Sequence, residues 1–252
     1  MIFKSYIIVL LLILNSVFSF SQVSITDSMI GLNSLSFNYS YILPAADMSK
    51  RFGNSSQLSL QYMYKTKKNF FTDFSFGYFF GTNVKDSFIL DNIKTSEGYL
   101  INNQGLLCPV SIEQRGFNLN LTGGYIIPGI GPNPNSGIVL GFGLSFLQHK
   151  IFFDYTYGPV YQIENEYRKG YDRLTNGFGF IQKIGYQRFG NLGLGNYHVN
   201  LFIIEAFTQS RRDYDYYLQK KDTQKRTDII VGINVGFDIP LYRRIANDFY
   251  FK

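Results

Sequence analysis

The sequence has little of the material from which catalytic, metal or disulfide sites are built. Its 252 residues include one cysteine, two histidines and no tryptophan. A single cysteine excludes an internal disulfide, and two histidines leave little for a metal centre or an acid–base pair. After the N-terminal segment, no run reaches the roughly 18 apolar residues that indicate a membrane-spanning helix. Charged residues make up 17% of the chain, against about 25% in a typical globular domain.

The N-terminal segment has the order of a secretory signal peptide. Lys4 precedes an apolar run from Tyr6 to Leu14, and small and polar residues follow up to Gln22. We therefore predict a signal peptide at 1–21 and a single domain at 22–252. The alternative is an N-terminal membrane anchor, but this apolar run is much shorter than the roughly 20 residues that a spanning helix needs.

Aromatic residues and glycine are what the chain has in abundance: 25 Phe, 20 Tyr and 24 Gly. In eight segments, large apolar residues alternate with small or polar ones. Phe74, Phe76 and Tyr78, for example, alternate with Ser75 and Gly77. This period of two predicts β-strands, because successive side chains of a strand point to opposite faces. The connections between the segments are 44–56, 66–69, 82–115, 128–137, 158–174, 188–196 and 210–226.

One of the eight segments changes phase. From Ile138 to Phe146 the apolar residues occupy one parity, and from Ile151 to Tyr157 they occupy the other. We interpret the change after Gln148 as a β-bulge or as a strand that projects past the membrane, since a shift of one residue exchanges the two faces.

The distribution of residue size and charge favours a membrane barrel over a soluble fold. The polar face is small and the apolar face is aromatic, whereas the charges lie mostly between the segments. Small inward residues suit an eight-stranded barrel, and tyrosines at strand ends suit the aromatic girdles at the membrane surfaces. We predict an all-β fold, an eight-stranded antiparallel transmembrane up-and-down β-barrel of the bacterial outer membrane. A soluble sandwich or lipocalin-like barrel is the alternative.

The lengths of the connections predict an orientation. Long and short connections alternate, and bacterial barrels have longer extracellular loops than periplasmic turns. The N-terminus is therefore expected on the periplasmic side. At 34 residues on this assignment, the segment 82–115 is the largest external feature, and its length marks it as functional or disordered.

Several stretches resemble known proteins. They are Arg51–Gly53, Tyr64–Asn69, Gly131–Gly137, Phe146–Ile151, Lys169–Gly177, Phe207–Tyr214 and Asn247–Phe251. Together they resemble a family of small outer-membrane barrels of Bacteroidota, related in architecture to OmpA-like and OmpW-like barrels. The resemblance covers nearly the whole mature chain and implies no catalytic motif.

Polar residues of inward parity are the first candidate site. They are Lys65, Asp73, Lys183, His198 and Asp238. A buried charge is costly unless it is paired, so we expect Lys–Asp pairs that plug the lumen. The alternative is an enzyme site of serine, histidine and carboxylate around His198. Such a site would require the three side chains to converge, and no motif indicates that they do.

The second candidate site is the connection 210–226. It contains Arg211, Arg212, Tyr214, Tyr216 and Tyr217, and arginine and tyrosine are favoured in binding hot spots. This loop, or the C-terminal tail, is predicted to contact another envelope protein; a merely solvated loop is the alternative. The net charge is +6, and we predict that its counterpart is the anionic headgroups of outer-membrane lipid rather than nucleic acid.

These observations predict a non-enzymatic protein without cofactors. The hypothesis is a structural or accessory subunit of the machinery that assembles the outer membrane or secretes proteins. A narrow channel or a carrier of small ligands, as in OmpW-like proteins, is the alternative.

Overall fold

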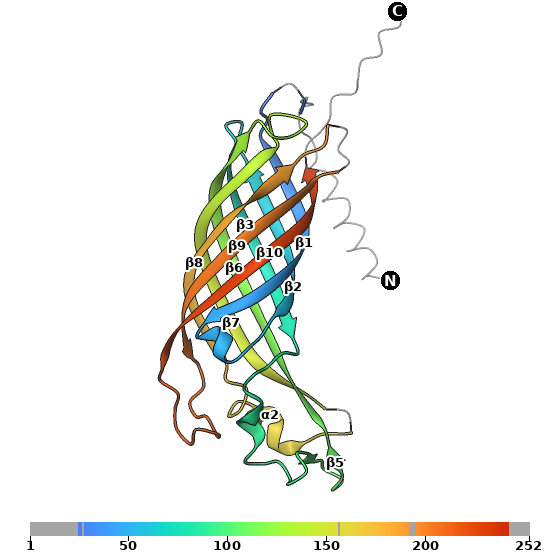
Figure 1. Ribbon diagram of the computed structural model, residues 1–252, viewed down its shortest axis with the longest axis vertical. Coiled ribbons are helices and arrows are strands. Elements are labelled where there is room, and N and C mark those ends of the chain that lie inside the picture. The colour runs from blue at the N-terminus through green and yellow to red at the C-terminus, as the bar shows by residue number, and fades with distance from the viewer. Residues whose placement is uncertain (1–24, 27, 156, 192–194, 242–252) are drawn as a thin grey trace, which may run out of the picture.

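A closed antiparallel β-barrel forms the body of the protein (Figure 1). The computed structural model describes residues 25–26, 28–155, 157–191 and 195–241, so the predicted signal peptide and the C-terminal tail lie outside the described residues. The barrel strands are β1 (Leu32–Ala46), β2 (Ser55–Lys65), β3 (Phe70–Gly81), β6 (Val110–Pro128), β7 (Gly137–Tyr155), β8 (Thr175–Arg188), β9 (Tyr197–Ser210) and β10 (Lys225–Leu241). Each pairs with its neighbour in the chain, and β1 closes the ring against β10. The predicted eight-stranded fold is confirmed.

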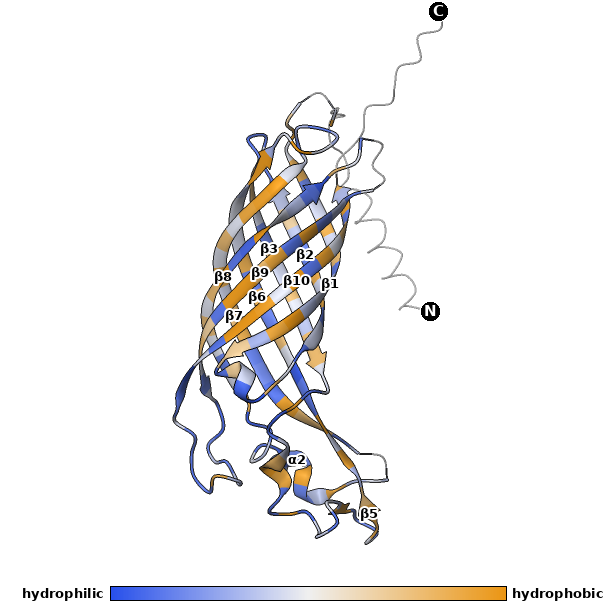
Figure 2. Cartoon of the chain, in the orientation of Figure 1, coloured by the Kyte–Doolittle hydropathy of each residue, from blue (hydrophilic) through white to orange (hydrophobic). Residues whose placement is uncertain are grey.

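The outer wall of the barrel is a belt of exposed apolar side chains. Phe74 and Phe76 on β3 are 50% and 42% exposed, whereas Asp73, which directly precedes Phe74, is 2% exposed. The same alternation recurs on every strand, which gives the apolar bands of Figure 2. A soluble sandwich would bury its bulky face, so the belt identifies a lipid-facing surface and confirms a transmembrane barrel.

Within the described residues, the helices are short: η1 (Met48–Lys50), η2 (Ser87–Leu90), η3 (Tyr161–Ile163) and α2 (Asn165–Arg168). None of the helices in the described ranges is long and apolar enough to cross a membrane.

The predicted bulge in β7 is wrong, and the predicted projection is right. The register between β6 and β7 runs without interruption from Pro128 paired with Gly137 to Val110 paired with Tyr155. On its other edge β7 pairs with β8 only as far as His149, so its last six residues extend past the barrel beside β6 alone. The apolar pattern changes parity because the inside of this end is itself apolar, and Ile151 lies there fully buried.

The barrel interior differs from the predicted lining of small residues. Polar side chains fill the middle, but an apolar layer crosses the lumen towards the long connections. Ile42, Phe79, Leu147, Phe202 and Ile230 form this layer, each 7% exposed or less. These residues have inward parity, so the alternation of inward and outward side chains also holds here. Only the large size of the inward side chains was unexpected.

The end with the short turns is closed by the segment that precedes β1. The buried side chain of Asn135 accepts hydrogen bonds from the Ile30 amide and from Lys65 Nζ, each 2.8 Å long. Its amide donates to the carbonyls of Ile25 and Ser28 at 3.0 and 2.8 Å. One asparagine thus holds the preceding segment beneath the barrel, where Ile25 and Ile30 join a second apolar cluster.

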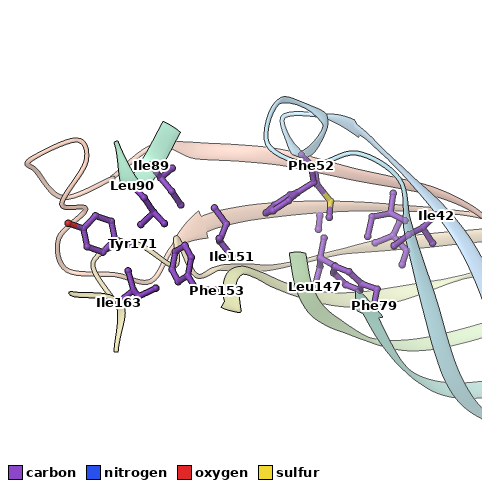
Figure 3. Packing of buried hydrophobic residues seen from close by; sticks show 14 of the residues in the cluster. Ile42, Phe52, Phe79, Ile89, Leu90, Leu147, Ile151, Phe153, Ile163 and Tyr171 are labelled. Atoms are coloured by element: carbon purple, nitrogen blue, oxygen red, sulfur yellow. The ribbon is translucent and has the colours of Figure 1, made fainter. Parts of the chain in front are cut away.

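At the opposite end the long connections form an ordered cap. We define the cap as residues 82–109, 157–174 and 211–224. The connection predicted at 82–115 ends at 109 because β6 begins at Val110, and it contains η2 and the paired strands β4 (Leu100–Ile101) and β5 (Leu107–Cys108). Figure 3 shows Ile89, Leu90 and Ile163 packed beside Phe153, beyond the mouth of the barrel. The connection is therefore ordered by its own apolar core, which also encloses the free thiol of Cys108.

Candidate functional site: the lumen and the cap

An ion pair crosses the middle of the lumen. Lys183 on β8 donates to the carboxylate of Asp73 on β3, and the two side chains are 7% and 1% exposed. The Lys183 ammonium also lies 5.0 Å from the centre of the Phe71 ring, within the range of a cation–π contact. The expected Lys–Asp pairing holds for these two residues, whose strands are separated in the ring by β7 and β6.

A second polar cluster lies nearer the short turns. His198 Nδ1 contacts both Asp238 oxygens at 3.0 and 3.1 Å, and His198 Nε2 lies 2.9 Å from Asn234 Oδ1. The Ser36 hydroxyl and the Gln187 amide donate to the same carboxylate. The serine thus bonds the acid and not the imidazole, so no nucleophile is paired with a base here.

Lys65 does not join either pair. Its buried ammonium donates to the Ile30 carbonyl at 2.9 Å and to Asn135 at 2.8 Å. Because the preceding segment folds beneath the barrel, carbonyl and amide oxygens solvate this cation in place of a carboxylate. The expectation that Lys65 pairs with an aspartate is therefore wrong, and so is the expectation that Asp238 pairs with a lysine.

A third polar cluster, which the sequence did not predict, lies beneath the cap. His149 Nε2 lies 2.8 Å from Asp228 Oδ2, to which the Thr208 hydroxyl also donates at 2.5 Å. The ring of Phe52 packs edge-on against the imidazole at 5.3 Å. The inward parity of Asp228 was the available signal, but its side-chain contact with His149 joins β10 to β7, two strands that do not pair, and the sequence does not show such a contact.

The cavity found among the polar lumen side chains of the described residues is too small for a ligand. Beside Asp73 and Lys183 it has a volume of about 40 Å³, against roughly 300–1,000 Å³ for typical small-molecule pockets. The apolar layer lies on one side of it and the Asn135 closure on the other. No group of three or more histidine, cysteine or acidic side chains that could hold a metal occurs in the described ranges.

The two arginines of the predicted partner loop bond within the protein. Arg212 Nε donates to Asp172 at 2.7 Å, and Arg211 Nε donates to Asn176 at 2.6 Å. The hydrogen bond to Asp172 raises the pKa of Arg212. Arg212 thus fastens the loop 211–224 to the loop 157–174 and Arg211 fastens it to β8, which leaves the arginines little freedom to meet a partner.

A network of alternating charges joins the cap to the barrel mouth. Arg173 pairs with Asp86 at 2.7 Å and with Asp215 at 3.0 Å, and Arg226 pairs with Asp222 at 2.6 Å. Burial raises the pKa of Asp222, but the hydrogen bonds from Arg226 and the Gln224 amide, together with the charges of Arg226 and Arg51, outweigh burial, and the pKa is lowered. These pairs connect all three cap segments, so the cap is one rigid unit. The two Arg173 pairs join residues from different loops, which sequence patterns do not reveal, whereas Arg226 and Asp222 are four residues apart in the chain.

The tyrosines of the partner loop have different environments. Tyr216 is wedged against Gly170, where an added Cβ would lie 2.0 Å from its ring, and packs at 5.2 Å against Tyr171. Tyr214 and Tyr217 are 45% and 39% exposed. The structure therefore places Tyr216 in the framework of the cap and the other two on its surface.

A pocket of about 690 Å³ opens on the cap surface, where the three segments meet. Five tyrosines line it, together with two glutamines, one asparagine and one isoleucine. The lining residues are Asn92, Ile93, Tyr161, Gln162, Tyr167, Tyr171, Tyr214, Tyr216 and Gln219. We call it the tyrosine pocket. None of these side chains carries a charge.

No protein-family model matches the chain, and no curated protein matches it in sequence. Solved structures of small outer-membrane barrels resemble it in architecture. Ail of Yersinia pestis, solved with the heparin analogue sucrose octasulfate, has a TM-score of 0.38 and 13% identity over 83% of this chain and 100% of Ail. Neisserial surface protein A has a TM-score of 0.41 and 7% identity over 82% and 96% of the two chains. Escherichia coli outer membrane protein W has a TM-score of 0.35 and 12% identity over 82% and 97%.

Similarities at this level carry no information about function, and the Bacteroidota resemblance stays a prediction. The conclusion on location rests on the molecule itself. A closed antiparallel barrel with an apolar outer belt, short turns at one end and long connections at the other has the design of outer-membrane barrels. The chain is an outer-membrane β-barrel with a closed lumen and a structured cap.

Proposed function

We propose that this protein is a non-enzymatic anchor that presents its cap to another component of the cell envelope, as an accessory subunit of a larger assembly. The observation that carries the proposal is the contrast between the two parts. The lumen is filled with paired charges and apolar side chains, whereas the cap is rigid and leaves large aromatic side chains in water. Exposed aromatic groups on a fixed framework are typical of binding surfaces.

The partner surface centres on the tyrosines rather than on the arginines. The Tyr217 ring packs against the Phe88 ring, with their centres 5.1 Å apart, and its centre lies 5.7 Å from the Arg173 guanidinium. The ring is therefore held in place while 39% of the residue stays exposed. A side chain that is already ordered loses little conformational entropy on binding. Tyr214 and Tyr217 are therefore the candidate contact residues.

Crosslinking in native membranes followed by purification tests the proposal. The protein should copurify with a defined envelope component, and replacing both Tyr214 and Tyr217 with serine should abolish the crosslink. The matched control is Ile130→Ser in the turn 129–136, which removes a 57% exposed apolar side chain at the opposite end of the barrel. A crosslink unaffected by the tyrosine changes would exclude the cap as the contact surface.

Conductance measurements test the alternative, a narrow channel. A lumen closed by the apolar layer and by the Asn135 contacts should give no stepwise current in planar lipid bilayers. Regular single-channel steps from purified protein would favour the channel and overturn the anchor.

A further inference from the structure

We propose that the tyrosine pocket binds a neutral saccharide. This inference rests on the proposed function, since it specifies the chemistry of what the cap recognises. The pocket lies at the end predicted to face outward, where saccharides of the cell envelope are accessible, and it is built from three separate loops.

The first argument is the arrangement of the rings. Tyr171 and Tyr216 form the floor, with their ring centres 5.2 Å apart and inclined at 60°, and Tyr214 lies 5.7 Å from Tyr216. Tyr161 on η3 and Tyr167 on α2 are each 61% exposed. A pyranose ring presents C–H groups on its faces, and these pack against aromatic rings without the need for charge.

The second argument is the set of free polar groups between the rings. In the described part of the chain, the side-chain amides of Gln162 and Gln219 make no hydrogen bond, and both residues are exposed. Each amide carries donors and an acceptor, which matches the neighbouring hydroxyl groups of a sugar. Asn92 donates to the Tyr171 hydroxyl at 3.4 Å, so a third amide is held at the edge of the floor.

The third argument is electrical neutrality. No charged residue lines the tyrosine pocket. Of the cations nearest in sequence, Lys169 pairs with Glu166 at 2.7 Å and Arg212 pairs with Asp172, while Arg168 donates to the Ile163 carbonyl and neither it nor Lys220 lines the pocket. An anionic ligand such as a sulfated or phosphorylated sugar would find no cation here to replace its hydration.

The geometry also disfavours an extended peptide as the ligand. Peptides are commonly held by backbone hydrogen bonds to an exposed strand edge. All the residues that line the tyrosine pocket lie in turns, loops or short helical segments. The pocket therefore offers ring faces and side-chain amides, and no strand edge.

Calorimetric titration of the purified full-length barrel tests the inference. The detergent should be lauryldimethylamine oxide, because a sugar-headed detergent would compete for the site. The probes are maltotetraose, cellotetraose and chitotetraose, with a heparin-derived tetrasaccharide as the charged comparison. At least one neutral probe should bind saturably, and Tyr161→Ser and Tyr167→Ser should each weaken that binding by about tenfold.

The matched control is Tyr99→Ser, which removes a 40% exposed cap tyrosine outside the pocket and should leave the affinity unchanged. The inference is overturned if none of the neutral probes binds, if the heparin fragment is the only ligand, or if the pocket variants bind as the parent does. If the envelope crosslink persists in Tyr161→Ser while no saccharide binds, the inference falls and the proposed function stands. If both the crosslink and saccharide binding are absent from the parent protein, both fall.

Discussion

Removing the carboxylate of Asp73 should destabilise the barrel by about 3 kcal/mol. The change Asp73→Ala leaves the Lys183 ammonium, which is 7% exposed, without its counter-charge in the middle of the lumen. Two unit charges 4 Å apart attract by about 4 kcal/mol at an effective dielectric constant of 20. Breaking a buried ion pair by removing one partner typically costs about 3–5 kcal/mol. We expect the lower end, because the Phe71 ring and nearby lumen amides partly solvate the remaining cation.

Urea unfolding in lipid vesicles, followed by circular dichroism, measures this free energy. The double variant Asp73→Ala/Lys183→Met should recover much of the loss, since it removes the unpaired charge and leaves an apolar side chain. Thr122→Val is the control: it alters a buried neighbour of Asp73 without touching the pair, and should cost about 1 kcal/mol or less. If Asp73→Ala costs no more than the control, or if the two changes are additive, the ion pair does not stabilise the lumen.

Three further predictions concern the belt, the closed end and the cap. Leu60→Arg, which puts a cation on the lipid-facing wall in the middle of β2, should cost about 2–4 kcal/mol in vesicle unfolding, whereas Ile130→Arg in the turn 129–136 should cost about 1 kcal/mol or less. Asn135→Ala should lower the unfolding free energy by about 1–3 kcal/mol, because it strips partners from buried polar groups; undiminished stability and protease resistance of the segment 25–31 would contradict its role. Because the folded-state pKa of Asp222 lies below its ordinary value of 3.8, its stabilising effect is complete above about pH 4 and is lost as the pH falls through the folded pKa. Protection of the loop 211–224 in hydrogen exchange should follow that course and lose its pH dependence in Asp222→Asn.

The strands were predictable because lipid leaves a strong signal on one face. Exposed residues such as Phe76 must be apolar and their strand neighbours such as Ser75 must fit a narrow lumen, so the period of two is visible along each segment. The pairing of Lys183 with Asp73 followed from parity together with the cost of an unpaired charge.

The errors arose where the barrel meets other parts of the chain. The phase change after Gln148 admitted a bulge or a projecting strand, and the bulge is wrong because Leu147 and Ile151 face the apolar layer and the cap core without a break in register. Lys65 was expected to need a carboxylate, but the segment before β1 supplies carbonyl oxygens instead. Local periodicity cannot report contacts between elements that are distant in sequence, and both errors involve such contacts.

The cap could be predicted only as a set of loops. Its rigidity comes from pairs such as Arg173 with Asp86, and from apolar contacts between segments that have no regular period. The tyrosine pocket has the same origin, since it exists only where Tyr161, Tyr214 and Asn92 are brought together.

Spin-label accessibility along β3 tests most directly whether the aromatic face of the strands contacts lipid. In a Cys108→Ser background, nitroxides at positions 74, 76 and 78 would be compared with one at position 161 in the cap, in lipid vesicles. The three belt labels should relax strongly with lipid-soluble oxygen and weakly with a water-soluble nickel chelate, and the cap label should show the reverse. Equal, high exposure of the belt labels to the nickel chelate would mean that Phe74, Phe76 and Tyr78 face water, and the membrane barrel would be contradicted.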